Sequence, residues 1–153
     1  MISTPDRIDW SALSPEDLAQ AQFYMGLINA ATTFREYIIW VKGFRIRHHQ
    51  ESWIQALQDL ADGVLTDNLG RLCHKLMILA PPESTKSSIV RYWLEWVIGR
   101  WYMAGRDPSV VYVTNTDDFA RENSRRIHDT IVLAYDNNSP EQAHRYSLTF
   151  PGV

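Results

Sequence analysis

The residues from Leu76 to Ser88 read LMILAPPESTKSS and have the layout of a phosphate-binding loop. They begin with a short apolar run that is long enough for one buried strand. A turn with two prolines follows, and the pair Lys86-Ser87 then opens a segment with the apolar periodicity of a helix. In such a loop the backbone N–H groups at the helix start point at phosphate oxygens, and the helix dipole favours negative charge there.

The residues at the helix start have the chemistry that nucleotide phosphates require. Lys86 is placed to reach the β- and γ-phosphates, and the Ser87 hydroxyl is placed to hold Mg²⁺. We therefore expect the ATP phosphates to be bound by five consecutive residues: Ser84, Thr85, Lys86, Ser87 and Ser88.

The loop departs from the usual pattern at its two glycine positions, which here hold Ala80 and Thr85. A β-branched residue resists positive φ, so the loop is not expected simply to copy the glycine geometry. The alternative interpretation is an ordinary strand-to-helix turn, capped by Ser84 or Thr85, with Lys86 in solvent.

Composition restricts the class of protein. With 153 residues the chain is one domain or part of one, and its 45% hydrophobic and 22% charged residues are ordinary for a globular protein. A net charge of −3 gives no general attraction to nucleic acid or to anionic membranes. A single cysteine, Cys73, excludes an internal disulfide framework and fits a reducing compartment. No apolar run approaches the ~20 residues of a membrane span, so we expect no membrane association and a cytoplasmic location.

Patterns along the chain predict alternating helices and strands after an initial helical part. Ser14-Pro15-Glu16-Asp17 is a strong helix start. Further helices are expected at about 51–61, ended by Gly63, after the loop as far as Gly99, and at about 117–132. The apolar run 110–113 suits a second buried strand, and the residues from 137 onward are turn-rich, with no closing element expected.

Strand, helix, strand and helix in succession imply a right-handed crossover and a parallel sheet. We therefore expect an α/β protein with a partial P-loop NTPase fold, in which crossover helices join parallel β-strands. Residues 1–45 are expected to form an N-terminal helical segment, and residues 46–153 the first half of a P-loop ATPase domain.

Short motifs between residues 34 and 135 recur in the order found in one known family. The first group comprises His48-His49, Trp53, Gly63, Arg71-Leu72, residues 77–82 and Lys86-Ser87. The second group comprises residues 111–116, Phe119-Ala120 and residues 124–127. Taken together, these motifs resemble the ATPase domain of the large terminase subunit of tailed bacteriophages, and the double-proline loop is the most specific of them.

The resemblance implies the ATP-binding part of an ATP-driven DNA-packaging motor, with ATP and Mg²⁺ as cofactors. In that family the N-terminal domain hydrolyses ATP to drive DNA into a capsid, and a C-terminal nuclease domain cuts the concatemer. It implies as partners phage DNA and the portal or small terminase subunit, bound through the full-length protein. A homo-oligomer in the host-cell cytoplasm is also implied. Gln50 lies where a glutamine often reads adenine in such ATPases.

Several features of that family are missing. Many terminases carry an arginine inside the phosphate loop, where this chain has Pro82-Glu83. The second acidic motif and the nuclease domain lie beyond residue 153, and Asp136 is a poor substitute because it follows a continuing helical pattern. We therefore expect a truncated ATPase domain that does not hydrolyse ATP alone. The alternative is a non-catalytic fragment or interaction module that retains a degenerate P-loop fold.

Four other residues are capable of binding a metal, but they occur in adjacent pairs rather than at zinc-ligand spacing. They are His48, His49, Cys73 and His74. We therefore expect no metal site at these residues and interpret the histidines as exposed loop residues.

Overall fold

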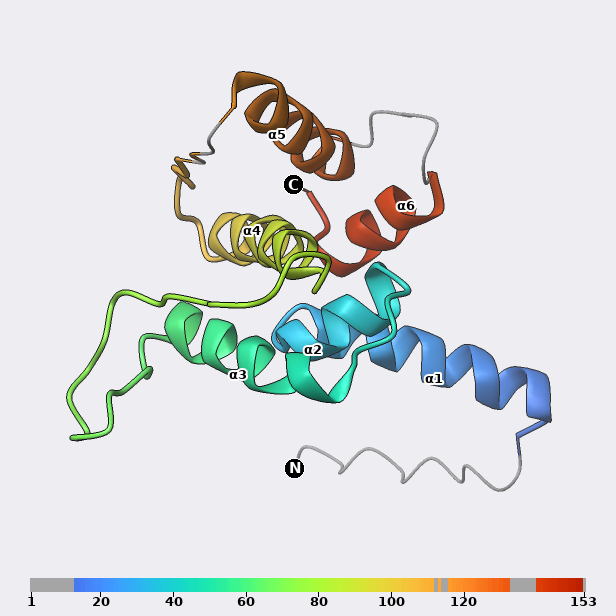
Figure 1. The fold of residues 1–153 in the computed structure, drawn as a ribbon. Coiled ribbons are helices and arrows are strands. Elements are labelled where there is room, and N and C mark those ends of the chain that lie inside the picture. Colours follow the sequence, from blue (N-terminus) through green and yellow to red (C-terminus); the bar gives the residue numbers. More distant parts are fainter. Residues whose placement is uncertain (1–12, 112, 114–115, 133–139, 153) are drawn as a thin grey trace.

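The computed structural model describes residues 13–111, 113, 116–132 and 140–152, and within these residues the fold is helical. Figure 1 shows α2, α3, α4 and α6 gathered at the centre, α1 reaching outward, and a long segment between α3 and α4 that loops away from the helices. The elements are α1 Pro15–Ala30, α2 Phe34–Glu36, the π-helical turn η2 Tyr37–Val41, α3 His48–Asp62, α4 Lys86–Met103, α5 Asp117–Ile131 and α6 Pro140–Thr149.

The expected α/β fold with parallel strands is wrong. The part of the chain that the structure describes contains no strand, and its one isolated bridge pairs Thr66 with Leu72. The apolar run 76–80 is extended but unpaired, so every second side chain faces solvent: Met77 is 80% exposed and Leu79 is 82% exposed. In the second run Val111 and Val113 are similarly exposed, and Tyr112 lies outside the described residues. Apolar composition favours an extended backbone, but a sheet also needs a neighbour whose hydrogen bonds satisfy that backbone.

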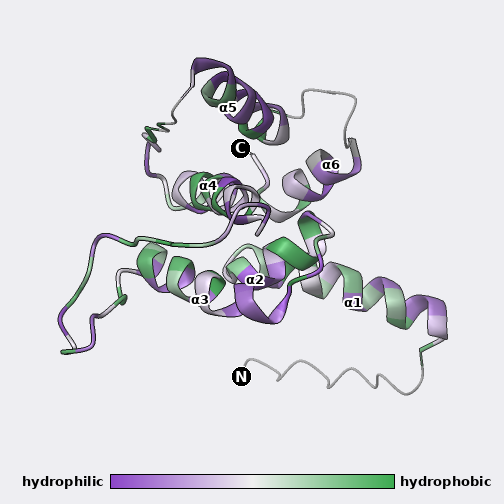
Figure 2. Ribbon diagram, in the orientation of Figure 1, coloured by the Kyte–Doolittle hydropathy of each residue, from purple (hydrophilic) through white to green (hydrophobic). Residues whose placement is uncertain are grey.

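The expected helix boundaries with local signals are confirmed. The Ser14 side chain accepts a hydrogen bond from the Asp17 N–H and caps α1, with Pro15 in the first helical position. Gly63 ends α3 in the left-handed conformation, with φ of 71°. The helix expected at 117–132 is α5, which is mostly hydrophilic (Figure 2).

Gly99 does not stop the helix that follows the loop. It lies buried inside α4, which continues to Met103. A Cβ atom at Gly99 would lie 2.6 Å from Cδ2 of Phe150, so this glycine allows the close approach of the segment after α6. The expected helix stop is therefore wrong because close packing, and not termination, requires a glycine here.

The expected absence of a closing element is also wrong. Helix α6 packs against η2, α1 and α5, and Tyr146 and Phe150 are almost completely buried. The Tyr146 hydroxyl donates a hydrogen bond to the Glu95 carbonyl at 3.1 Å, which ties α6 to α4.

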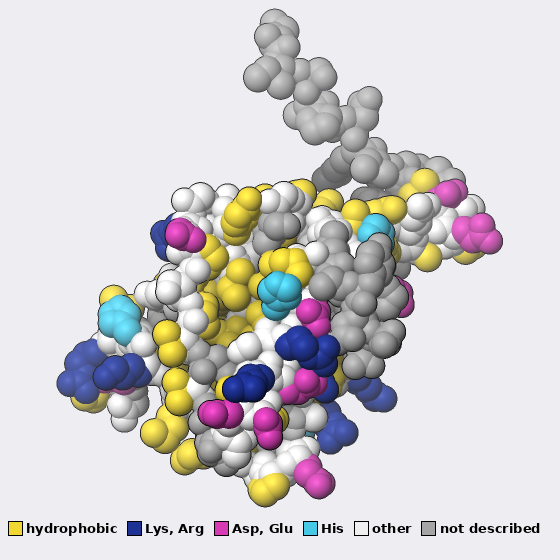
Figure 3. Space-filling view, turned by 90° about the horizontal axis from the view of Figure 1, so that it is seen from above, with side chains coloured by type: hydrophobic (Ala, Val, Ile, Leu, Met, Phe, Trp, Pro, Cys, Tyr) yellow, Lys and Arg dark blue, Asp and Glu magenta, His cyan; other side chains and the backbone are white. Residues whose placement is uncertain are grey.

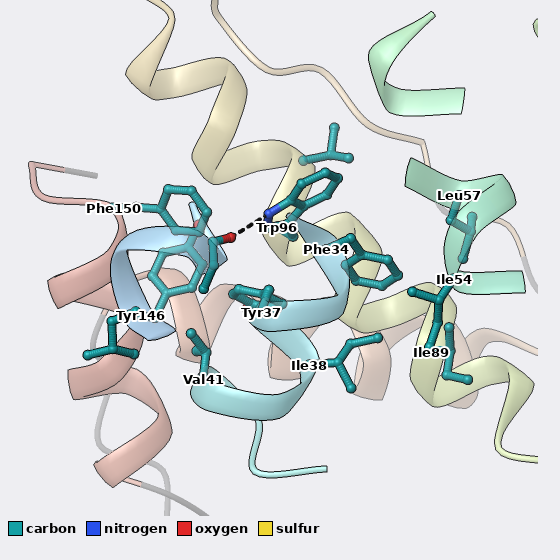
Figure 4. Packing of buried hydrophobic residues seen from close by; sticks show 13 residues of the cluster. Phe34, Tyr37, Ile38, Val41, Ile54, Leu57, Ile89, Trp96, Tyr146 and Phe150 are labelled. Atoms are coloured by element: carbon teal, nitrogen blue, oxygen red, sulfur yellow. Dashed lines mark hydrogen bonds between the residues drawn. The ribbon is translucent and has the colours of Figure 1, made fainter. Parts of the chain in front are cut away.

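The core combines aliphatic side chains of α1, α3, η2 and α4 with large aromatic side chains of α2, η2, α4 and the chain around the end of α6 (Figure 4). The rings of Phe34 and Trp96 lie 5.3 Å apart between centroids. The Trp96 indole also donates a hydrogen bond to the Ala30 carbonyl at 2.8 Å, so its one polar atom is satisfied inside the core. The core thus joins elements from both sides of residue 45, and the division of the chain there stays a prediction.

A buried ion pair lies beside this core. Lys42 Nζ contacts Glu95 Oε2 at 2.8 Å, and both side chains are almost fully buried. The Tyr37 hydroxyl donates to the same oxygen at 3.0 Å, and Arg91 Nε lies 3.9 Å from the other carboxylate oxygen. Burial, together with the nearby Glu95 carboxylate, raises the pKa of Tyr37 well above its ordinary value. We call these four residues, Tyr37, Lys42, Arg91 and Glu95, the Glu95 network.

None of the helices in the described part of the chain is both long and apolar enough to cross a membrane.

Candidate phosphate-binding loop

The residues that precede α4 form a tight loop with two left-handed positions. Glu83 and Thr85 both have φ of 62°, and they are the two non-glycine residues with positive φ among the described residues. Such strain persists only where the surroundings hold it in place, and it clusters at ligand-binding sites. The expectation that Thr85 would prevent glycine-like geometry is therefore wrong, because Thr85 adopts that geometry.

Hydrogen bonds of the Thr85 hydroxyl explain how a β-branched residue is held in this conformation. Thr85 Oγ1 donates to the Ser84 carbonyl at 2.5 Å and accepts from Gln50 Nε2 at 2.5 Å. The side chain makes no capping bond to α4, although Thr85 occupies the N-cap position. The alternative of an ordinary turn capped by Thr85 therefore lacks its cap.

The loop curves around a hollow at the N-terminus of α4. The hollow has a volume of about 430 Å³ and is lined by the consecutive residues from Ala80 to Ser88, including all five expected phosphate-binding residues. Because α4 is 18 residues long, its N-terminus carries the full helix dipole. The Thr85 carbonyl accepts from the Ile89 N–H at 3.1 Å, so the amides of residues 86–88 precede the first α4 hydrogen bond and lack partners within the helix.

Ser84 contributes a buried polar atom to the loop. Its Oγ is shielded from solvent and finds no hydrogen-bond partner within the described residues. A buried hydroxyl without a partner is costly, and native proteins rarely keep one unless a water, an ion or a ligand satisfies it.

Two charged residues, Glu83 and Lys86, line the hollow. Lys86 is half-buried at the hollow and forms no ion pair with any described residue. Ser87 is exposed and Ser88 half-buried. Glu83 also lines the hollow, and its carboxylate would repel phosphate there; the residue is exposed, so dissolved ions partly screen its charge.

The Gln50 side chain is not exposed beside the loop, whereas a side chain that hydrogen-bonds to a base has to be accessible. It is fully buried on α3, and its Oε1 accepts from the Arg47 N–H at 2.8 Å. Its Nε2 donates to Thr85 Oγ1 and lies 3.5 Å from the Ser84 carbonyl. The amide therefore links α3 to the loop across 35 residues of sequence.

The remaining candidates form no site. His48, His49 and His74 are exposed and Cys73 is half-buried, and the described residues contain no group of metal-capable side chains. Asp136 lies outside the described residues.

The sequence interpretation missed a second hollow, of about 290 Å³, between the C-terminal ends of α3 and α4. Its wall carries three charged residues, Asp62, Arg100 and Arg106. Two of them pair with each other, because Arg100 contacts Asp62 at 2.8 Å, and Arg100 also lies 4.5 Å from the Trp96 ring centroid.

Comparison of the chain with protein-family models, curated proteins and solved structures finds no match. The chemistry of the loop therefore rests on its own geometry. A hollow at a helix N-terminus, lined by a lysine that forms no ion pair with any described residue, is suited to bind an anionic group of the size of phosphate.

Proposed function

We propose that residues 80–88 bind the phosphates of ATP together with Mg²⁺, and that the chain serves as the ATP-binding part of a phage terminase large subunit. The observation that carries this proposal is the left-handed turn at Thr85, which arranges nine consecutive residues around one hollow at the start of α4. The link to DNA packaging comes from the sequence resemblance.

Each group of the loop has a role in this proposal. The backbone N–H groups of residues 86–88 donate hydrogen bonds to the phosphate oxygens, and Lys86 adds a charge-assisted hydrogen bond. The Ser87 residue is exposed and lines the hollow, and its hydroxyl is the metal ligand in this proposal; Mg²⁺ would neutralise phosphate charge there.

Binding is not sufficient for hydrolysis. Phosphoryl transfer also requires a carboxylate near the metal, a residue that orients the attacking water, and a cation for the developing charge. Among the described residues no cluster of acidic or histidine side chains could hold a metal, and the loop carries Glu83 where an arginine would assist. We therefore propose that this chain binds ATP and does not turn it over alone.

The test is a titration of the purified chain with ATP and Mg²⁺, with phosphate release measured in parallel. Replacing Lys86 by alanine should weaken binding by about 1.5–3 kcal/mol, which is roughly tenfold to 150-fold in Kd. Lys75→Ala is the matched control, because Lys75 is an exposed lysine on the segment that leads into the loop. Equal affinity of wild type and Lys86→Ala would refute the phosphate site, and steady phosphate release above the Lys86→Ala blank would refute the non-hydrolytic proposal.

One observation favours a second candidate, an interaction module. The side chains of Met77, Leu79, Val111 and Val113 are each at least 80% exposed, and none of these four residues lies in a helix or strand. Figure 3 also shows hydrophobic side chains gathered near the middle of one face of the molecule. Exposed apolar patches often mark interaction sites, so these side chains favour contact with another protein or with a second copy of this chain. Phage DNA, the portal and the small terminase subunit remain partners that the resemblance implies for the full-length protein. A chain that binds no nucleotide but elutes as an oligomer would favour this second candidate.

A further inference from the structure

We infer that Gln50 is a positioning residue of the loop, which holds Thr85 in its left-handed conformation and so sets the affinity for polyphosphate without reading the base. This inference rests on the proposed phosphate-binding function. It differs from the sequence expectation, in which Gln50 contacts adenine.

Both polar groups of the Gln50 side-chain amide already have hydrogen-bond partners inside the protein. Its Oε1 accepts from the Arg47 N–H at 2.8 Å, and its Nε2 lies 2.5 Å from Thr85 Oγ1 and 3.5 Å from the Ser84 carbonyl. A glutamine that reads adenine uses its carbonyl and its NH₂ group together. Since Gln50 is also fully buried, that pair of atoms is not presented to a base.

The hydroxyl that Gln50 contacts belongs to the most strained residue of the loop. Thr85 is β-branched and has φ of 62°, a combination that is a genuine outlier for L-residues. Its Oγ1 uses its donor on the Ser84 carbonyl and an acceptor position on Gln50, so both contacts favour the observed rotamer and backbone. Without the Gln50 contact, we expect Thr85 to relax toward negative φ.

Relaxation at Thr85 would act directly on the hollow. Thr85 is the N-cap residue of α4, and the peptide that it shares with Lys86 carries the first helical amide. A change in the Thr85 backbone therefore reorients that amide and the Ser84 segment, and the groups around the hollow no longer converge. The effect falls on the phosphates, which every nucleotide shares, and not on the base.

The experiment compares three ligands with Mg²⁺: ATP, GTP and inorganic tripolyphosphate. Gln50→Ala should weaken all three by a similar factor, about threefold to tenfold, which is the loss expected for one hydrogen bond. Thr85→Val keeps the branched shape and removes the hydroxyl that Gln50 contacts. It should therefore cause a loss of affinity similar to that of Gln50→Ala. In a Thr85→Gly background, where positive φ is not strained, the effect of Gln50→Ala should fall below about twofold.

Gln58→Ala is the matched control for fold stability. Gln58 also lies on α3 and also anchors another segment, since its Oε1 accepts from the Phe34 N–H at 2.7 Å, but it has no contact with the loop. Its variant should lower the melting temperature and leave the affinity for all three ligands unchanged.

Four results would overturn the inference. Loss of ATP binding alone would mean that Gln50 reads the base. An equal loss of affinity in Gln58→Ala would mean that fold stability alone explains the effect. Unchanged affinity in both Gln50→Ala and Thr85→Val would refute positioning while leaving the phosphate site intact. A wild-type chain that binds none of the three ligands would instead refute the proposed function, and this inference with it.

Discussion

The Glu95 network and the loop before α4 both remove polar side chains from water, but they differ in what satisfies those side chains. In the network, the Glu95 carboxylate receives Lys42, Tyr37 and Arg91 from two elements of the protein. In the loop, the Ser84 hydroxyl is buried without a partner, and Lys86 lacks an ion pair, among the described residues.

Buried polar side chains can therefore have two different roles in this protein, one in the stability of the fold and one in ligand binding. A network whose members satisfy one another contributes to the specificity of the fold and needs nothing from outside. A loop that holds strained backbone and an unsatisfied hydroxyl costs stability in the isolated chain. Strained backbone of this kind clusters at ligand-binding sites, so mutations in the two regions should have opposite profiles: loss of stability in the Glu95 network and loss of binding in the loop.

The largest effect is expected in the Glu95 network. Glu95→Ala would leave the Lys42 ammonium buried beside the core without its anion, and breaking a buried pair in this way costs about 3–5 kcal/mol of unfolding free energy. Urea denaturation measures the loss. Glu122→Ala removes an exposed glutamate that pairs with Arg126 on α5, and should leave the urea midpoint nearly unchanged. A similar midpoint for both variants would show that the network is not what holds η2 to α4.

An intermediate effect is expected where α6 closes the core over this network. Gly99→Ala would place a Cβ 2.6 Å from a Phe150 ring atom, and overpacking of this kind costs about 1–3 kcal/mol. Thermal unfolding of the single variant and of Gly99→Ala combined with Phe150→Leu gives the comparison. The smaller leucine should recover part of the stability that Gly99→Ala loses. This packing would be contradicted if the double variant lost the sum of the stabilities that the two single substitutions lose.

The smallest effect on stability is expected in the loop. Ser84→Ala removes a buried hydroxyl that has no partner among the described residues, so unfolding free energy should change by less than about 1 kcal/mol, and in the stabilising direction if at all. Ser52→Ala, at an exposed position on α3, is the control for removing a serine hydroxyl outside the loop. Marked destabilisation by Ser84→Ala would show that the hydroxyl has a structural partner, and would remove the contrast between the two regions.

Helix boundaries could be predicted from the sequence wherever the signal is local. Ser14-Pro15-Glu16 marked α1, and the left-handed glycine at 63 marked the end of α3. The sequence Ser139-Pro140-Glu141 repeats the first of these patterns just where α6 begins at Pro140, so the sequence also contained a start signal for the helix that was missed.

Features that depend on distant neighbours could not be predicted. The apolar run 76–80 has the composition of a buried strand, but composition does not show whether a partner strand exists. The role of Gly99 depends on Phe150, which lies on a segment that packs against α4 only in the folded chain. In the candidate site, Lys86 and its neighbours were identified from the motif, whereas the left-handed Thr85 depends on a glutamine 35 residues earlier.

The π-helical turn η2 determines which of its side chains point toward Glu95. Tyr37 and Lys42 are five residues apart and contact the same oxygen of Glu95, and the Lys42 N–H donates to the Tyr37 carbonyl at 3.2 Å. In an α-helix, residues five apart point about 140° away from each other, so the two side chains could not share a target. The wider turn accommodates one additional residue and brings both onto one face. A deletion between them would restore α-helical register, and every later residue of the turn would rotate by about 100°. The pairing of lysine, tyrosine and glutamate in this core is thus a consequence of one inserted residue, as much as of the side chains themselves.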